Sequence, residues 1–168
     1  MDTVKPSLKG LLVIDPSIYI DNRGCFFETW SKKTYQNLGL DVDFVQDNQS
    51  VSQKGVLRGL HFQNPPFAQG KLVRVIKGSV IDVVVDIRKD SETYGQHFSI
   101  KLSDKNHKIF WIPPGFAHGF ISLEDDTIFA YKCTDFYNKE SEGALFWNDP
   151  ELNIDWGFNN PLVAEKDM

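Results

Sequence analysis

The chain has 168 residues, of which 41% are hydrophobic and 13% aromatic, and a formal net charge of −5 at pH 7. This length and composition exclude a disordered chain and predict one ordered domain spanning residues 1–168. The acidic charge balance argues against nucleic-acid binding through a basic surface, but it leaves room for a locally positive pocket that binds a phosphorylated small molecule.

Cysteine content and hydropathy indicate the cellular setting. Cys25 and Cys133 are too few for a disulfide framework, and they form no cysteine-based metal motif. Residues 1–10 lack the apolar core of a signal peptide. No apolar run approaches the ~20 residues that a transmembrane helix needs. We therefore expect a cytoplasmic protein without a membrane partner.

The first third of the chain predicts short strands and one helix. An apolar run at 11–14 and an aromatic-rich run at 25–30 are typical of strands, with a turn sequence at 21–24 between them. Ser31 is placed to cap a helix that continues to Leu38, and Gly39 is placed to end it. The polar run at 44–50 indicates either a solvated loop or a set of donors and acceptors for a polar ligand.

The middle of the chain predicts an all-β fold. Short runs with a period near two follow one another, separated by Gly, Pro, Asn and Asp, at 72–76, 80–88, 97–102, 108–112, 116–123 and 127–134. Strands at this spacing indicate a β-sandwich or barrel. Residues 147–168 are aperiodic, and we expect them to form an extended arm that packs Leu152, Ile154 and Trp156 against the sheet.

Residues 55–71 concentrate charge on an apolar strand that three glycines interrupt. Such a strand can line a pocket for an anionic ligand, with Arg58 binding the charge and His61 moving a proton. The alternative is a solvated arginine and a core histidine. In a regular strand the two side chains would point to opposite faces because they are three positions apart. A β-bulge at Gly59 would bring them to one face.

Histidine spacing argues against a metal site. Residues 113–120, which include His118, resemble the second sequence motif of the cupin jelly rolls. Metal-binding cupins carry a first motif with two histidines one residue apart, whereas residue 63, two positions after His61, is Gln63. A transition metal needs three or four converging ligands, so we expect no metal.

Without a metal, four side chains become candidates for proton transfer. His61 and His118 suit acid–base work or hydrogen bonding. Lys71 could stabilise an anionic intermediate, and Tyr131 could return a proton. The alternatives are an exposed lysine and a tyrosine with its hydroxyl in water.

Several segments, in order along nearly the whole chain, carry a family resemblance: Asp21–Gly24 with Phe27–Glu28, Phe44–Ser50, Gly55–Gln63, Gln69–Gly78, Asp82–Arg88, Trp111–Phe120, Tyr131–Thr134 and Trp147–Pro150. Together they resemble the dTDP-4-dehydrorhamnose 3,5-epimerase family of cupin-fold enzymes. The resemblance implies an antiparallel jelly-roll β-sandwich with one short helix near the N-terminus. It also implies a homodimer with strands exchanged or paired across the interface, and no cofactor.

The resemblance further implies an activity and a set of site residues. The reaction would convert dTDP-4-dehydro-6-deoxy-D-glucose to dTDP-4-dehydro-L-rhamnose, with His61 as base, Tyr131 as acid, Lys71 beside the 4-keto oxygen and Asp167 orienting His61. The positions matching substrate contacts are Arg23, Glu28, Gln46, Asn48, Arg58, Lys71, His118, Glu142 and Lys166.

Three other functions fit parts of this pattern. Relatives with similar motifs epimerise only C3 or only C5 of a related dTDP-4-keto sugar. A cupin that binds a nucleotide sugar without turnover would retain the pocket, although the presence of His61, Lys71 and Tyr131 argues against it. A metal-dependent cupin oxygenase or isomerase would need ligands that the sequence does not group together.

Overall fold

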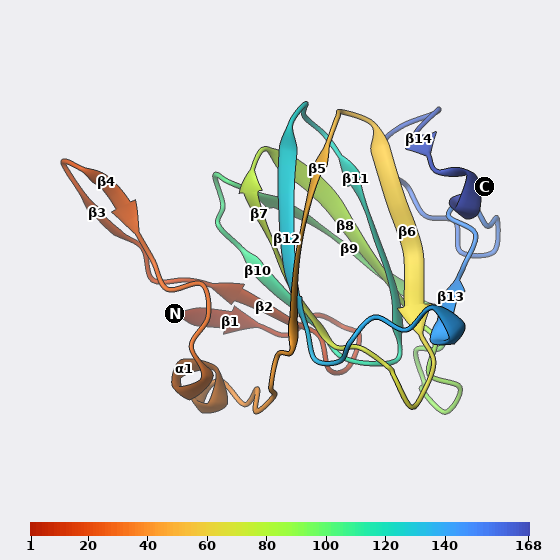
Figure 1. The fold of residues 1–168 in the computed structure, drawn as a ribbon, viewed down its shortest axis with the longest axis horizontal. Helices are drawn as coiled ribbons and strands as arrows, with labels where there is room; N and C mark the ends of the chain where they lie inside the picture. Colours follow the sequence, from red (N-terminus) through yellow and green to blue (C-terminus); the bar gives the residue numbers. More distant parts are fainter.

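The computed structural model describes residues 1–168, which form two packed six-stranded sheets and a separate hairpin (Figure 1). The first sheet runs in the order β1 (Asp2–Val4), β2 (Leu12–Asp15), β10 (Ile109–Ile112), β7 (Lys71–Lys77), β12 (Thr127–Cys133) and β5 (Gln46–Ser52). The second runs in the order β13 (Glu142–Ala144), β6 (Val56–Gln63), β11 (Phe116–Ser122), β8 (Ser79–Asp86) and β9 (His97–Ser103). The short β14 (Leu162–Val163) adds to β6 and is the one parallel pairing. This is the expected all-β jelly-roll sandwich.

The core lies between the two sheets, where alternate residues of each strand meet. Buried side chains there include Val73 and Val75 of β7, Val84 of β8, Phe120 of β11 and Phe129 of β12. Phe120 and Phe129 stack with ring centroids 4.1 Å apart, which joins the sheets beside the functional cavity.

The C-terminal region covers the outer face of the second sheet, as expected. Trp156 is buried there and donates from Nε1 to the carbonyl oxygen of Trp147 at 2.9 Å. Leu152 and Ile154 pack against the same cluster. The arm also contains β13, β14 and the 3₁₀ turns η1 (Lys139–Ser141) and η2 (Glu165–Asp167), which the aperiodic sequence did not predict.

Helix α1 (Lys32–Asn37) confirms the predicted helix, which begins after Ser31 and ends before Gly39. Gly39 has a φ of 87°, the left-handed conformation that favours glycine after a helix. Ser31 occupies the N-cap position, but its side chain makes no capping hydrogen bond. No helix of the protein is long and apolar enough to span a membrane.

Two expectations need correction. The polar run at 44–50 is not a loop: most of it lies in β5, which pairs with β12 along its whole length. β5 is an edge strand whose outer residues face solvent, and its inner residues are Ser50 in the cavity lining and the hydrogen-bonded pair of Gln46 and Asn48, so polar side chains suit both faces. The aromatic run at 25–30 is a strand only at its start, in β4 (Gly24–Phe26). With β3 (Tyr19–Asp21), β4 forms a hairpin that projects from the body (Figure 1).

Candidate active site

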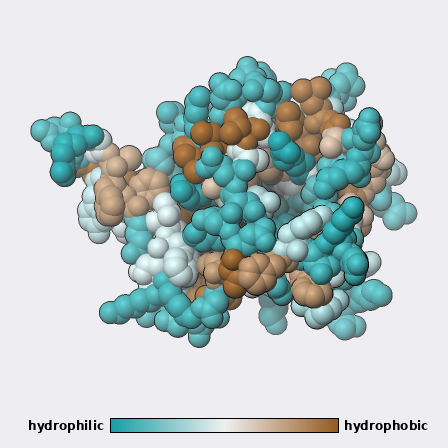
Figure 2. All heavy atoms as spheres, in the orientation of Figure 1, coloured by the Kyte–Doolittle hydropathy of each residue, from teal (hydrophilic) through white to brown (hydrophobic).

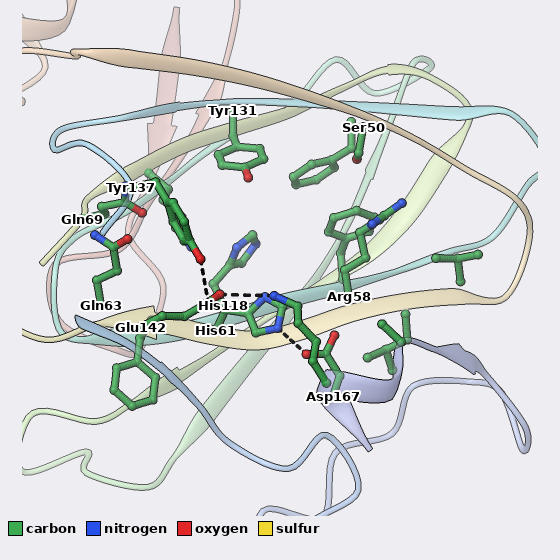
Figure 3. A pocket seen from close by; sticks show the side chains of 18 of the residues that line it. Ser50, Arg58, His61, Gln63, Gln69, His118, Tyr131, Tyr137, Glu142 and Asp167 are labelled. Carbon is green, nitrogen blue, oxygen red and sulfur yellow. Dashed lines mark hydrogen bonds and ion pairs between the residues drawn. The ribbon is translucent and has the colours of Figure 1, made fainter. Parts of the chain in front are cut away.

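An interior cavity of about 410 Å³ opens between the sheets at the level of β6, β11, β7 and β12. Eight of the predicted site residues line it: Arg58, His61, Lys71, His118, Tyr131, Glu142, Lys166 and Asp167. Figure 3 shows polar side chains converging on this space from both sheets and from the C-terminal turn.

The bulge that we expected at Gly59 is present. His61 lies opposite His118 and Arg58 lies opposite Phe120, so three steps along β6 match two along β11. The extra residue brings Arg58 and His61 to the same cavity. Gly59 has a φ of 132°, and a Cβ there would lie 2.4 Å from the Cα of Gly119. Only glycine fits this conformation and this close approach between strands.

His61 forms a hydrogen-bonded pair with Asp167, whose η2 turn lies beside β6. The distance from Nε2 of His61 to Oδ1 of Asp167 is 2.6 Å, and the Asp167 side chain is only 3% exposed. An ionised carboxylate accepts from Nε2–H, which leaves Nδ1 as the basic nitrogen. The arrangement can therefore abstract a proton and stabilise the resulting imidazolium.

Lys71 and Tyr131 face His61 from the other sheet. The Nζ atom of Lys71 lies 6.0 Å from the centre of the Tyr131 ring. Burial lowers the pKa of Lys71, while the negative charges of Asp82 and Glu142 and the thiol of Cys133 oppose that effect. Burial raises the pKa of Tyr131, which keeps the phenol protonated as a proton donor must be.

A second histidine–aspartate pair lies beside the first. Nε2 of His118 is 2.8 Å from Oδ2 of Asp82, and the Asp82 side chain is completely buried. The His118 ring stacks on Phe129 at 6.2 Å between centroids. Asp82 falls in the strand predicted at 80–88, but sequence reasoning gave it no function.

Glu142 connects three segments at the rim of the cavity. Tyr137 donates from its hydroxyl to Oε2 of Glu142 at 3.0 Å, and Lys166 donates from Nζ to Oε1 at 3.3 Å (Figure 3). Partial burial alone would raise the pKa of Glu142, but these two donors hold it below its ordinary value. The ion pair between Lys166 and Glu142 joins the η2 turn, which carries Asp167, to β13.

Four predicted site residues do not line this cavity. Gln46 and Asn48 lie on β5 and bond to each other at 3.1 Å, and Oε1 of Gln46 accepts from the backbone N–H of Tyr137 at 2.9 Å. Arg23, at the tip of the hairpin, pairs with Asp21 and is 85% exposed. Glu28 follows the hairpin, outside the cavity lining.

Sequence reasoning missed four polar residues of the cavity. Gln63 holds the loop at 136–138 through bonds to Phe136 and Asn138. Its place two residues after His61, on the same strand face, was an available signal. Gln69, Tyr137 and Ser50 also line the cavity, and the buried hydroxyl of Ser50 has no partner within the chain.

No three His, Cys, Asp or Glu side chains come together in a way that could hold a metal ion. The fold and the cavity thus define a cupin-type protein whose site consists of acid–base side chains and cations. Its base and its phenol belong to opposing sheets, which is suited to proton transfer on a ligand held between them.

Comparison with known proteins identifies the family within this class. The model of the dTDP-4-dehydrorhamnose 3,5-epimerase family matches residues 5–168, and the chain belongs to this family. It is 50% identical over 167 residues to the dTDP-4-dehydrorhamnose 3,5-epimerase of Methanothermobacter thermautotrophicus, covering 98% of this chain and 90% of the relative.

Two solved structures are informative neighbours. The dTDP-6-deoxy-D-glucose-3,5-epimerase of Legionella pneumophila, in complex with dTDP-4-keto-L-rhamnose, superposes with a TM-score of 0.95 at 49% identity, covering 99% of this chain and 89% of that one. ChmJ, a 3'-monoepimerase from Streptomyces bikiniensis in complex with dTDP-quinovose, reaches a TM-score of 0.91 at 31% identity, covering 96% and 83%.

Proposed function

We propose that the protein inverts C3 and C5 of dTDP-4-dehydro-6-deoxy-D-glucose to give dTDP-4-dehydro-L-rhamnose. The observation that carries this proposal is the position of His61 and Tyr131 on opposing sheets, on either side of one cavity. A base and an acid that reach a carbon from opposite faces invert its configuration. Membership in the epimerase family supports the same reaction.

Each inversion is two proton transfers. The 4-keto group acidifies the neighbouring C–H bonds, so Nδ1 of His61 can take a proton and leave an enolate, whose negative oxygen the Lys71 ammonium stabilises. The Tyr131 hydroxyl then gives its proton to the same carbon from the other face. Asp167 holds the His61 ring and stabilises its protonated form. Arg58 and Lys166, at the cavity wall, are the cations for the diphosphate.

The test is proton NMR of the substrate incubated with the protein in deuterated water. Deuterium at both C3 and C5 is expected, together with the L-rhamno product. The similarity to the 3'-monoepimerase ChmJ makes inversion of a single carbon the second candidate function. Deuterium at only one of the two carbons would establish it. Binding of dTDP without any exchange would indicate a cavity without turnover.

We further propose that the single domain of residues 1–168 works as a homodimer. Figure 2 shows a hydrophilic tip on the projecting hairpin. The hairpin also exposes Tyr19, Ile20 and Phe26, with Ile20 at 80% exposure. A second copy would bury these side chains and could receive Arg23 at its own cavity. Light scattering should give twice the chain mass. Mixing inactive Arg23→Ala and His61→Ala variants should restore part of the activity, whereas no recovery would mean that each chain uses its own Arg23.

A further inference from the structure

Asp82 is a completely buried carboxylate that the proton transfers above do not use. It lies on β8 next to His118 of the cavity lining, and its Oδ2 bonds to Nε2 of His118 at 2.8 Å. Its other oxygen, Oδ1, is buried and has no hydrogen-bond partner within the chain. Because burying a carboxylate is costly, a position like this calls for a reason.

The register of the strands pairs this carboxylate with a site residue. His118 and His61 are directly opposite each other on β11 and β6, so both rings project from the same face of one sheet. Each uses Nε2 to bond a buried aspartate, Asp167 for His61 and Asp82 for His118. Two neighbouring histidine–aspartate pairs therefore lie at the cavity, with both histidines in its lining.

Asp82 has two cationic or hydrogen-bonding neighbours that act on its carboxylate. Burial raises the pKa of Asp82 above its ordinary value, and the charge and hydrogen bond of His118 and the positive charge of Lys71 offset part of this rise by stabilising the ionised form. Phe129 stacks on the other side of the His118 ring and brings no charge. With these two neighbours present we take Asp82 as a carboxylate, which can only accept a hydrogen bond at the 2.8 Å contact, so the proton of a neutral His118 lies on Nε2.

We propose that Asp82 is a positioning residue that fixes the tautomer of His118, so that Nδ1 of His118 faces the ligand as a hydrogen-bond acceptor for a sugar hydroxyl. Lys71 then offers a donor to the keto oxygen while His118 offers an acceptor to a hydroxyl. A ligand that carries a ketone and a free hydroxyl nearby meets both requirements. The identity of that ligand rests on the proposed function, whereas the tautomer of His118 does not.

Asp82→Asn keeps the size of the side chain but removes its charge. Its amide can donate to Nε2 and so favour the opposite tautomer of His118. Asp86→Asn is a matched control, because Asp86 lies four residues further along β8 and its side chain is equally buried. It bonds Arg88, Ser91 and Thr93 away from the cavity.

The decisive measurement is the ¹⁵N chemical shifts of the His118 ring in the resting protein, without ligand. Wild type and Asp86→Asn should show protonated Nε2 and unprotonated Nδ1, and Asp82→Asn should show the reverse. A protonated Nδ1 of His118 in the wild type would overturn the proposal. This measurement uses the wild-type protein alone, so it does not depend on whether a variant folds.

Turnover supplies the second readout. Asp82→Asn should lower kcat by about tenfold or more, since a wrongly oriented donor faces the hydroxyl, whereas Asp86→Asn should change stability but not the rate per folded molecule. Unchanged ¹⁵N shifts and a rate within a factor of two of wild type in Asp82→Asn would also refute the proposal. If wild type exchanges no deuterium at all, the proposed function fails while the tautomer assignment is still decided by the shifts.

Discussion

Replacing Asp167 with asparagine removes the negative charge behind His61 without changing the size of the side chain. The two residues are joined by a 2.6 Å hydrogen bond, and the carboxylate is 3% exposed, so solvent does little to screen it. The bond is strongest when His61 has taken the substrate proton and become an imidazolium. The variant should therefore lose stabilisation mainly in the transition state.

The expected size of the effect follows from the energy of such a bond. Hydrogen bonds to charged groups contribute about 1.5–3 kcal/mol, and each 1.36 kcal/mol changes a rate by about tenfold. Asp167→Asn should therefore slow exchange at C3 and C5 by about 10- to 150-fold. Because the affinity for dTDP depends on other residues, calorimetry should show it nearly unchanged.

The assay is deuterium incorporation measured by NMR at equal protein concentration. Glu165→Gln is the matched control, because Glu165 lies in the same η2 turn, is exposed and does not line the cavity. Its rate should equal that of wild type. If Asp167→Asn exchanges within a factor of two of wild type, the pair does not assist proton abstraction and the argument is wrong.

Three further changes test other parts of the site. Burial lowers the pKa of Lys71, so the ammonium is lost as pH rises through a value below that of free lysine, and the exchange rate should fall there. Lys71→Arg, which stays protonated, should shift this fall to higher pH, and an unshifted pH–rate profile would exclude Lys71 as its cause. Tyr131→Phe should suppress inversion but preserve dTDP binding in calorimetry, while loss of binding would make Tyr131 a ligand contact. Gly59→Ala should lower the free energy of unfolding in urea by at least about 2 kcal/mol, because it forces a non-glycine residue into φ 132° against Gly119. A loss below about 0.5 kcal/mol would show that the strands can part without cost.

Strand prediction succeeded where one face of the strand packs in the sandwich core. In β9, Phe98, Ile100 and Leu102 pack at the core and alternate with the exposed residues His97, Ser99 and Lys101, so period two is visible in the sequence. In β5 the inner residues are also polar, with Ser50 in the cavity lining and Gln46 bonded to Asn48, and outer residues such as Asp47 face solvent. Hydropathy then has no period, and the strand reads as a loop.

The site was predictable in part because a local irregularity has a local signal. Arg58 and His61 could share a cavity only if β6 contained an extra residue, and Gly59 was the one position able to accommodate it. By contrast, the contact between His61 and Asp167 joins residues 106 positions apart. No pattern within either segment specifies that distance, and only the resemblance to a family suggested it.

Asp82 and Asp86 show most clearly what sequence alone does not decide. Both lie on the same face of β8, and both side chains are fully buried, so their strand positions are equivalent. Asp86 bonds to Arg88 and Thr93 within seven residues, and its pKa is held below its ordinary value because these donors outweigh the effect of burial. Asp82 finds its one hydrogen-bond partner, His118, 36 residues away, in the cavity. Asp86 is stabilised by donors of its own turn, so its burial serves the fold. Asp82 is held only by a cavity histidine, and its burial has a reason only if His118 must be held in place.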